Sequence, residues 1–153
     1  MTRLSELTTL RLGGPASAVA DARSEDELLD AVRGDGDVLL LAGGSNLVIA
    51  DDGWPGTVVR VLTRGVEERE RDGRVELTAA AGEEWEPFVA RCVAEGLAGV
   101  ESLSGIPGSI GATPIQNVGA YGQEVAETIV SVRALERATG EVRDLPPEDG
   151  GFA

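Results

Sequence analysis

The chain lacks histidine altogether and has a single cysteine, Cys92, among its 153 residues. Histidine is the commonest general base and metal ligand at neutral pH, so its absence excludes a Ser-His-Asp or Cys-His catalytic group. One cysteine can form neither an internal disulfide nor a Cys-x-x-Cys zinc site. The sequence therefore predicts no metal site.

Lysine is absent as well, so all 13 basic residues are arginine, against 27 acidic residues and a net charge of −14. Without lysine the chain cannot form a Walker A phosphate loop, which needs a Gly-Lys-Ser/Thr sequence. A chain this acidic repels the phosphates of nucleic acids, and no basic patch is visible in the sequence. We therefore expect no nucleic-acid partner.

Long hydrophobic runs are also missing. No segment approaches the roughly 18 consecutive apolar residues of a membrane-spanning helix. The N-terminus has no apolar core of the kind found in signal peptides. We therefore expect a cytoplasmic protein with no membrane partner. Because aromatic residues make up only 3% of the chain, the core must be built from Val, Leu, Ile and Ala.

Glycine, by contrast, is abundant, and it is concentrated in the segment GIPGSIGATPIQNVGAYG, residues 105–122. Glycine and proline at this density disfavour a helix or a central strand. The segment nevertheless carries apolar residues, and a loop of this kind can present backbone N–H groups to a phosphate or to the edge of a flat ring. Its glycines do not match the Gly-x-Gly-x-x-Gly spacing of a Rossmann fold. The alternative is a tight, buried connection that binds nothing.

A second glycine-rich loop follows the apolar run Val38–Leu41, which we expect to be a buried strand. The loop reads Gly43-Gly44-Ser45-Asn46. Two glycines permit a tight turn, and the Ser and Asn side chains can bond to the backbone or to a ligand. The arrangement suits a pyrophosphate, although Gly-Gly-Ser-Asn taken alone is also a common turn.

The apolar pattern predicts two lobes, residues 1–64 and 65–153. A helix in the first lobe is expected to begin at the capping residue Ser24 and to end at about Arg33, before a Gly34-Asp35-Gly36 turn. A helix in the second lobe is expected from about Glu84 to Glu95, with one apolar face. Strands are expected at residues 16–20, 38–41, 47–49, 57–62, 66–71, 74–80, 128–136 and 141–145.

The two loops together resemble the FAD-binding domain of the UDP-N-acetylenolpyruvoylglucosamine reductase (MurB) family. The segments TTLRLGGPA, residues 8–16, and DDGWPGTVV, residues 51–59, are similar to the same family, so the resemblance covers nearly the whole chain. PIQNVGAYG is its most distinctive part, whereas Gly-Gly-Ser-Asn is shared with other flavoproteins of the superfamily. The resemblance implies an α+β fold: a two-lobed FAD-binding domain of the PCMH (vanillyl-alcohol-oxidase-like) type, with FAD in the crevice between the lobes.

The resemblance also implies the residues that bind FAD. In the first loop they are Gly43, Gly44, Ser45, Asn46 and Leu47, and the backbone amides of the first four are expected to hold the pyrophosphate. In the second loop they are Ala112, Thr113, Ile115, Gln116 and Val118, which line the flavin, and Gly119, Ala120 and Tyr121, which close around it. Gln116 and Asn117 are expected to bond to the polar edge of the flavin ring, or alternatively to stabilise a turn. Trp85 is better explained by core packing than by flavin stacking.

The family's reaction, as the resemblance implies it, uses FAD with NADPH as hydride donor. It reduces a nucleotide-sugar substrate, UDP-GlcNAc-enolpyruvate, to UDP-N-acetylmuramate during peptidoglycan precursor synthesis. The family's catalytic arginine lies in a Tyr-Arg-x-Ser motif, and a serine and a glutamate follow later in the chain. This sequence stops where that motif is due, so the catalytic residues are expected beyond Ala153 and the segment alone is expected to be inactive. We assign no catalytic role to Ser104 or Ser109, and we expect a monomer.

Two other interpretations remain open. One is a stand-alone or truncated FAD-binding module with no catalysis of its own. The other is a different flavin oxidoreductase of the same fold, which should lack PIQNVGAYG.

Overall fold

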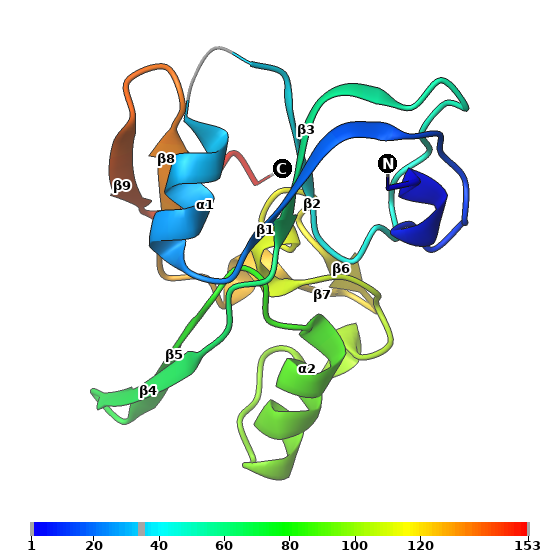
Figure 1. The fold of residues 1–153 in the computed structure, drawn as a ribbon. Coiled ribbons are helices and arrows are strands. Elements are labelled where there is room, and N and C mark those ends of the chain that lie inside the picture. The colour runs from blue at the N-terminus through cyan, green and yellow to red at the C-terminus, as the bar shows by residue number, and fades with distance from the viewer. Residues whose placement is uncertain (1, 34–35, 153) are drawn as a thin grey trace. The chain divides into compact units, whose positions relative to one another are not determined.

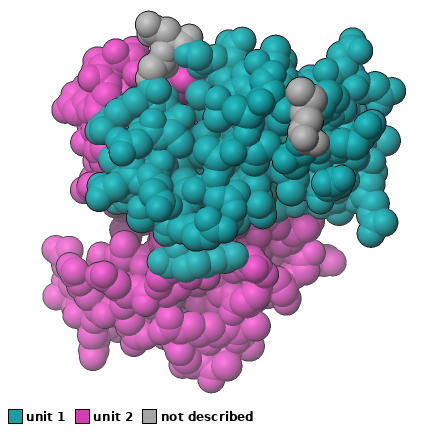
Figure 2. All heavy atoms as spheres, in the orientation of Figure 1, with its two compact units in different colours: residues 1–64 teal, residues 65–153 magenta. Residues whose placement is uncertain are grey.

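The computed structural model describes residues 2–33 and 36–152, and the chain divides into two units, residues 1–64 and 65–153 (Figure 2). Each unit is built around its own elements, which Figure 1 labels along the chain. Part of the turn expected at Gly34-Asp35-Gly36 lies outside the described residues. No helix in residues 2–33 and 36–152 is long and apolar enough to cross a membrane.

The first unit contains a three-stranded parallel sheet. Its strands are β1 (Ala16–Ala22), β2 (Val38–Leu41) and β3 (Trp54–Val61), in the order β1-β3-β2. Val19 of β1 and Leu39 of β2 both pair with Val58 of the central strand. Val58 and Val59 are fully buried, as expected for apolar residues in the middle strand of a parallel sheet.

Helix α1 (Glu25–Val32) connects β1 to β2 and packs against β1 and β3. Its N-cap is Ser24, whose side-chain oxygen accepts a hydrogen bond from the Glu27 amide at 3.2 Å. The helix start predicted from this capping pattern is therefore confirmed. A 3₁₀ turn, η1 (Leu4–Glu6), precedes the sheet and places Leu4 in the core of the unit, with Leu41 and Val58.

In its described residues, 65–152, the second unit contains three antiparallel hairpins and one α-helix. The hairpins pair β4 (Val66–Arg71) with β5 (Arg74–Ala79), β6 (Gly119–Ala120) with β7 (Gln123–Glu124), and β8 (Val132–Glu136) with β9 (Glu141–Leu145). Helix α2 (Trp85–Ala94) buries Trp85, Val89 and Cys92. Short 3₁₀ turns are η2 (Glu101–Leu103), η3 (Ile110–Ala112), η4 (Val125–Glu127) and η5 (Pro147–Asp149).

The core of the second unit explains why α2 forms. Trp85, Val89 and Cys92 lie on one face of the helix and pack with Leu103 and Val118 in a single buried cluster. Trp85 is 2% exposed, so its interpretation as a core residue is confirmed. Burial raises the pKa of the Cys92 thiol, which therefore stays protonated at neutral pH and packs as a small apolar group.

Three strand predictions need correction. Residues 47–49 form no strand. They belong to the connection between the parallel strands β2 and β3, and Leu47 and Ile49 pack on the core without pairing to another strand. The strand expected at 128–136 begins only at Val132, because η4 holds the chain until Thr128. Strand β3 begins earlier than expected, at Trp54, which pairs with Ala16 of β1.

Candidate functional site

The first glycine-rich loop begins two residues after β2 ends, and its conformation requires glycine at position 44. Gly44 has a φ of +66°, and a Cβ added there would collide with the backbone oxygen of Leu7. The loop is fastened to the N-terminal segment as well. The Thr9 amide donates to the Gly44 carbonyl at 3.0 Å, and the Thr9 hydroxyl donates to the Gly43 carbonyl at 3.5 Å. The loop is therefore held by its carbonyl groups.

Three of its backbone amides are unpaired within the described residues. Within the described residues, the amides of Gly43, Gly44 and Ser45 donate no hydrogen bond. Asn46 is exposed but makes an interaction within the protein. Leu47 is half-buried, and its side chain packs against the core of the first unit. Successive free amides beside a left-handed glycine are a typical binding surface for an anion such as a phosphate.

Hydrogen bonds from the first turn of α2 hold the start of the second glycine-rich loop. The Trp85 indole nitrogen donates to the Leu103 carbonyl at 2.9 Å, and the Trp85 amide donates to the Gly108 carbonyl at 3.1 Å. The Glu86 carboxylate accepts from the Ser104 hydroxyl at 2.8 Å and from the Gly105 amide at 2.5 Å. These hydrogen bonds hold the pKa of Glu86 below its usual value, with the Gly105 amide as the largest cause.

The middle of this loop is a tightly packed 3₁₀ turn. The Gly111 amide donates to the Ala81 carbonyl at 2.8 Å, and a Cβ on Gly111 would come within 2.6 Å of the Ala81 Cβ. Ala112 is half-buried in this turn. Thr113 is 4% exposed, and its hydroxyl donates to the Ile110 carbonyl at 2.8 Å. The side chain of Thr113 is thus already used to shape the loop.

The loop ends in the β6–β7 hairpin. Tyr121 and Gly122 form its two-residue turn with φ values of +53° and +81°, as expected where both turn residues are left-handed. Tyr121 is 95% exposed, and Ile115, earlier in the loop, is 84% exposed. Asn117 also has a positive φ, of 39°, and its side-chain amide donates to the Glu124 carboxylate at 3.0 Å.

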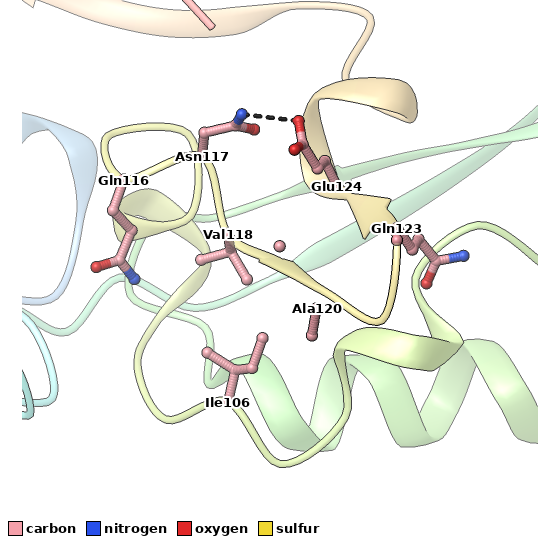
Figure 3. Close-up of a pocket in the computed structure, with 9 residues that line it drawn as sticks. Ile106, Gln116, Asn117, Val118, Ala120, Gln123 and Glu124 are labelled. Carbon is pink, nitrogen blue, oxygen red and sulfur yellow. Dashed lines mark hydrogen bonds between the residues drawn. The ribbon is translucent and has the colours of Figure 1, made fainter. Parts of the chain in front are cut away.

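A pocket of about 620 Å³ opens between the end of the loop and the hairpin (Figure 3). It is lined by Ile106, Gln116, Asn117, Val118, Gly119, Ala120, Gly122, Gln123 and Glu124. The structure therefore brings together four of the residues predicted to line the flavin or close around it, namely Gln116, Val118, Gly119 and Ala120. Asn117, which was expected to bond to the edge of the flavin ring, lines the same pocket. The predicted residues Ala112, Thr113, Ile115 and Tyr121 are not among its lining residues.

Sequence reasoning missed four of the lining residues, Ile106, Gly122, Gln123 and Glu124. A local signal for the last two was present: a two-residue turn, Tyr121-Gly122, implies that Gln123 and Glu124 pair back onto Gly119 and Ala120. Figure 3 shows Asn117 and Glu124 pointing toward one another from the two sides of this hairpin. The Oδ1 atom of Asn117 is buried and has no partner among the described residues.

Comparison with known proteins assigns the class. A family model described as "FAD binding domain" matches residues 16–146, and the chain belongs to this family. Its sequence corresponds to the FAD-binding part of the UDP-N-acetylenolpyruvoylglucosamine reductases, as the resemblance of the two loops predicted. The α+β, PCMH-type FAD-binding fold expected from that resemblance is confirmed too.

The similarity to curated reductases extends over nearly all of the chain. It is 54% identical to the enzyme of Saccharopolyspora erythraea over 97% of the chain, and 56% identical to that of Nocardia farcinica over 98%. These matches cover 42% and 39% of the two relatives, so the chain spans less than half of their length. The crystal structure of the reductase (MurB) from Thermus caldophilus aligns over 99% of this chain and 53% of its own. The TM-score is 0.78 at 29% identity.

Both loops have features that fit FAD. The amides of Gly43, Gly44 and Ser45 are unpaired within the described residues and suit a diphosphate. Ile115 and Tyr121 expose apolar surface that suits a flat ring. The first loop belongs to the first unit and the second loop to the second unit, and each loop by itself has groups that suit one part of FAD.

Proposed function

We propose that this chain is the FAD-holding portion of an NADPH-dependent reductase that converts UDP-GlcNAc-enolpyruvate to UDP-N-acetylmuramate in peptidoglycan precursor synthesis. The observation that carries the proposal is the 54% identity, over 97% of the chain, to a protein named UDP-N-acetylenolpyruvoylglucosamine reductase. When bound, FAD supplies hydride transfer between NADPH and the enolpyruvyl double bond.

The first loop binds the pyrophosphate in this proposal. The amides of Gly43, Gly44 and Ser45 donate to its oxygens, and the backbone of Asn46 and Leu47 continues the same segment. The support is that the loop is held from outside, through the two carbonyls that bond to Thr9. Its amides are therefore ordered before the anion arrives, which lowers the entropic cost of binding.

The second loop orients the flavin. Gln116 offers a hydrogen-bonding amide beside the apolar side chains of Val118 and Ala120 in the 620 Å³ pocket. Gly119 adds no side chain to this surface, and the exposed Ile115 and Tyr121 exclude water from the ring once they pack against it. Ala112 and Thr113 support the loop from beneath, since the Thr113 hydroxyl already bonds to Ile110.

We assign the role of proton donor to neither Ser104 nor Ser109. The Ser104 hydroxyl donates to the Glu86 carboxylate at 2.8 Å, so its proton is already engaged. The Ser109 side chain is 5% exposed, which leaves no access for a substrate double bond. The Ser109 hydroxyl is buried with no hydrogen-bond partner among the described residues.

A titration with FAD tests the cofactor half of the proposal. FAD added to this chain should show quenched flavin fluorescence and a shifted absorbance band. FMN, which lacks the pyrophosphate and the adenosine, should bind far more weakly. A chain that is folded by circular dichroism yet binds FAD no better than FMN would contradict the assignment of the two loops.

A chimera tests the substrate half. In this chimera, residues 1–153 of this chain replace the matching segment of the Saccharopolyspora erythraea reductase, to which they are 54% identical. The chimera should bind FAD and oxidise NADPH only when UDP-GlcNAc-enolpyruvate is present, with NADH tested as the parallel donor. A chimera that holds FAD and leaves this substrate unreduced would overturn the assignment of the reaction.

The proposed reactants also suggest where and how the protein works. NADPH and nucleotide sugars are cytoplasmic metabolites, so we propose a cytoplasmic location. We also propose a monomer. Cell fractionation and light scattering after size-exclusion chromatography measure the two properties directly.

A further inference from the structure

The N-terminal segment 9–14 is bonded at one end to the Gly-Gly-Ser-Asn loop and at the other end to Ala50, which follows that loop. At one end the Thr9 amide donates to the Gly44 carbonyl at 3.0 Å. At the other end the Gly14 amide donates to the Ala50 carbonyl at 2.9 Å, and a Cβ on Gly13 would lie 3.1 Å from the Ile49 Cβ. Residues 10–12 connect these two anchor points on one side, and residues 45–49 connect them on the other.

Arg11, at the centre of this connection, has an unusual backbone. Its φ is +54°, a left-handed conformation that is costly for any residue with a side chain. Asp72 and Tyr121, which share this conformation, each precede a glycine in a two-residue hairpin turn that demands it. Arg11 lies in no hairpin. Strain of this kind persists where the surrounding structure imposes it, often at a binding site.

The guanidinium of Arg11 is uncommitted. In residues 2–33 and 36–152 it makes no ion pair or hydrogen bond, whereas Arg23 and Arg60 both pair with Asp21. The residue is exposed. A free cation is therefore carried on the segment that borders the unpaired amides of the first loop.

Apolar side chains flank this cation. Leu10 is 54% exposed and Leu12 is 49% exposed, and Val48 in the neighbouring strip 45–49 is 75% exposed. Leu10 and Leu12 are the chain neighbours of Arg11, and Val48 follows the unpaired amides of the first loop, so these two segments offer both polar and apolar groups. The amides and the guanidinium suit a diphosphate, and the apolar side chains suit a flat, uncharged ring.

We propose that the segment Leu10-Arg11-Leu12 forms the second wall of the pyrophosphate site. Arg11 donates to the diphosphate oxygens, and the two leucines contact the adenine end of the same dinucleotide. The inference rests on the proposed function, and it supplies the positive charge that a loop of glycine, serine and asparagine lacks. Arg11 is a binding residue in this arrangement and takes no part in hydride transfer.

The test compares Arg11→Gln and Arg11→Lys with the wild-type chain in titrations with FAD and with ADP. Glutamine removes the charge, keeps a hydrogen-bonding group on a shorter side chain, and leaves the backbone strain of the position in place. Arg11→Gln should weaken both ligands by about tenfold, the loss expected for one charge-assisted hydrogen bond. Arg11→Lys should recover part of this loss, and the difference should shrink as salt is added.

The control is Arg3→Gln. Arg3 is exposed, belongs to the same unit, and has no ion pair or hydrogen bond from its side chain within the described residues. Its replacement removes the same charge and should leave both affinities unchanged. Equal losses in the two glutamine variants would mean that only the overall charge of the unit matters, and would overturn the inference.

The outcomes separate this inference from the proposed function. If the wild-type chain binds FAD and Arg11→Gln binds it equally well, the inference is wrong while the function stands. If the chain binds ADP in an Arg11-dependent way, with amide NMR shifts at Gly43, Gly44 and Ser45, but does not bind FAD, the function is wrong and the diphosphate site stands. If neither ligand binds to the folded chain, both are wrong.

Discussion

The carboxylate of Glu86, in the first turn of α2, accepts a hydrogen bond from the backbone amide of Gly105 at 2.5 Å. The Ser104 hydroxyl donates to the same carboxylate. The helix thereby fixes the point at which the chain enters the second glycine-rich loop. Because the pocket residues lie further along this loop, the position of the pocket depends on a side chain that does not line it.

Replacement of Glu86 should therefore weaken FAD binding without unfolding the protein. In Glu86→Ala the Ser104 hydroxyl and the Gly105 amide lose their shared acceptor, so the loop entry becomes mobile. We expect a severalfold lower FAD affinity with an unchanged circular dichroism spectrum. Glu70→Ala, at an exposed position of β4, is the matched control. Equal affinities in the two variants would show that the loop does not depend on Glu86.

The same contact predicts an acid limit for FAD binding. The pKa of Glu86 is lowered in the folded chain from its usual 4.5. A depressed carboxyl pKa means that the stabilisation is complete above 4.5 and is lost as the pH falls through the folded-state value. FAD affinity should stay level from pH 7 to about pH 4.5 and decline only below it. The difference between wild type and Glu86→Gln, measured by titration at each pH, should disappear in acid; a constant difference would contradict this assignment.

Gly44→Ala should be far more damaging than a similar change at another left-handed glycine. Gly140, in the β8–β9 turn, has a φ of +73° with nothing within 4 Å of an added Cβ. Its replacement by alanine should cost only the strain of a left-handed backbone, about 1–2 kcal/mol of unfolding free energy. A methyl group at Gly44 must in addition displace the Leu7 backbone. Urea unfolding of both variants checks the ranking, and equal losses would show that the Leu7 contact relaxes freely.

Trp85→Phe isolates one hydrogen bond at the base of the second loop. The indole N–H of Trp85 donates to the Leu103 carbonyl at 2.9 Å, and both groups are buried. Its loss leaves that carbonyl without a partner, which should cost about 1–3 kcal/mol of unfolding free energy. Trp54→Phe is the control, because the Trp54 indole nitrogen is buried with no partner among the described residues. If thermal unfolding gives the same loss for both, the Trp85 bond contributes nothing measurable.

The helices were predictable because their signals are local. Ser24 and Glu27 mark the start of α1, and the apolar face of α2 repeats within ten residues, so both helices match their predicted bounds to within a residue or two. The strand expected at 47–49 failed because an apolar run signals burial, and burial does not require a ladder. The β6–β7 hairpin was missed because two-residue strands are too short to show an alternating pattern.

The site was predictable only in part, for a related reason. The glycine-rich loops are recognisable as motifs, and four of the predicted residues line one pocket. Their supports come from distant positions: Glu86 is 19 residues from Gly105, and Thr9 lies far before Gly44 in the chain. Contacts of this range depend on how the elements pack, which no local pattern records.

Ile115 and Tyr121 provide the sharpest remaining test, because their exposure makes stability and binding separable. They are 84% and 95% exposed, so Ile115→Ala and Tyr121→Ala should change the unfolding free energy by less than about 0.5 kcal/mol. If FAD packs on them, burial of each side chain contributes to affinity, and its loss should weaken FAD by roughly tenfold. Val130→Ala is the control, since Val130 is 65% exposed and lies outside the loop. Fluorescence titration then decides: if both variants bind FAD as tightly as the control, these side chains are not part of the cofactor surface. In that case the flavin assignment contracts to the pocket formed by Gln116, Val118, Gly119 and Ala120.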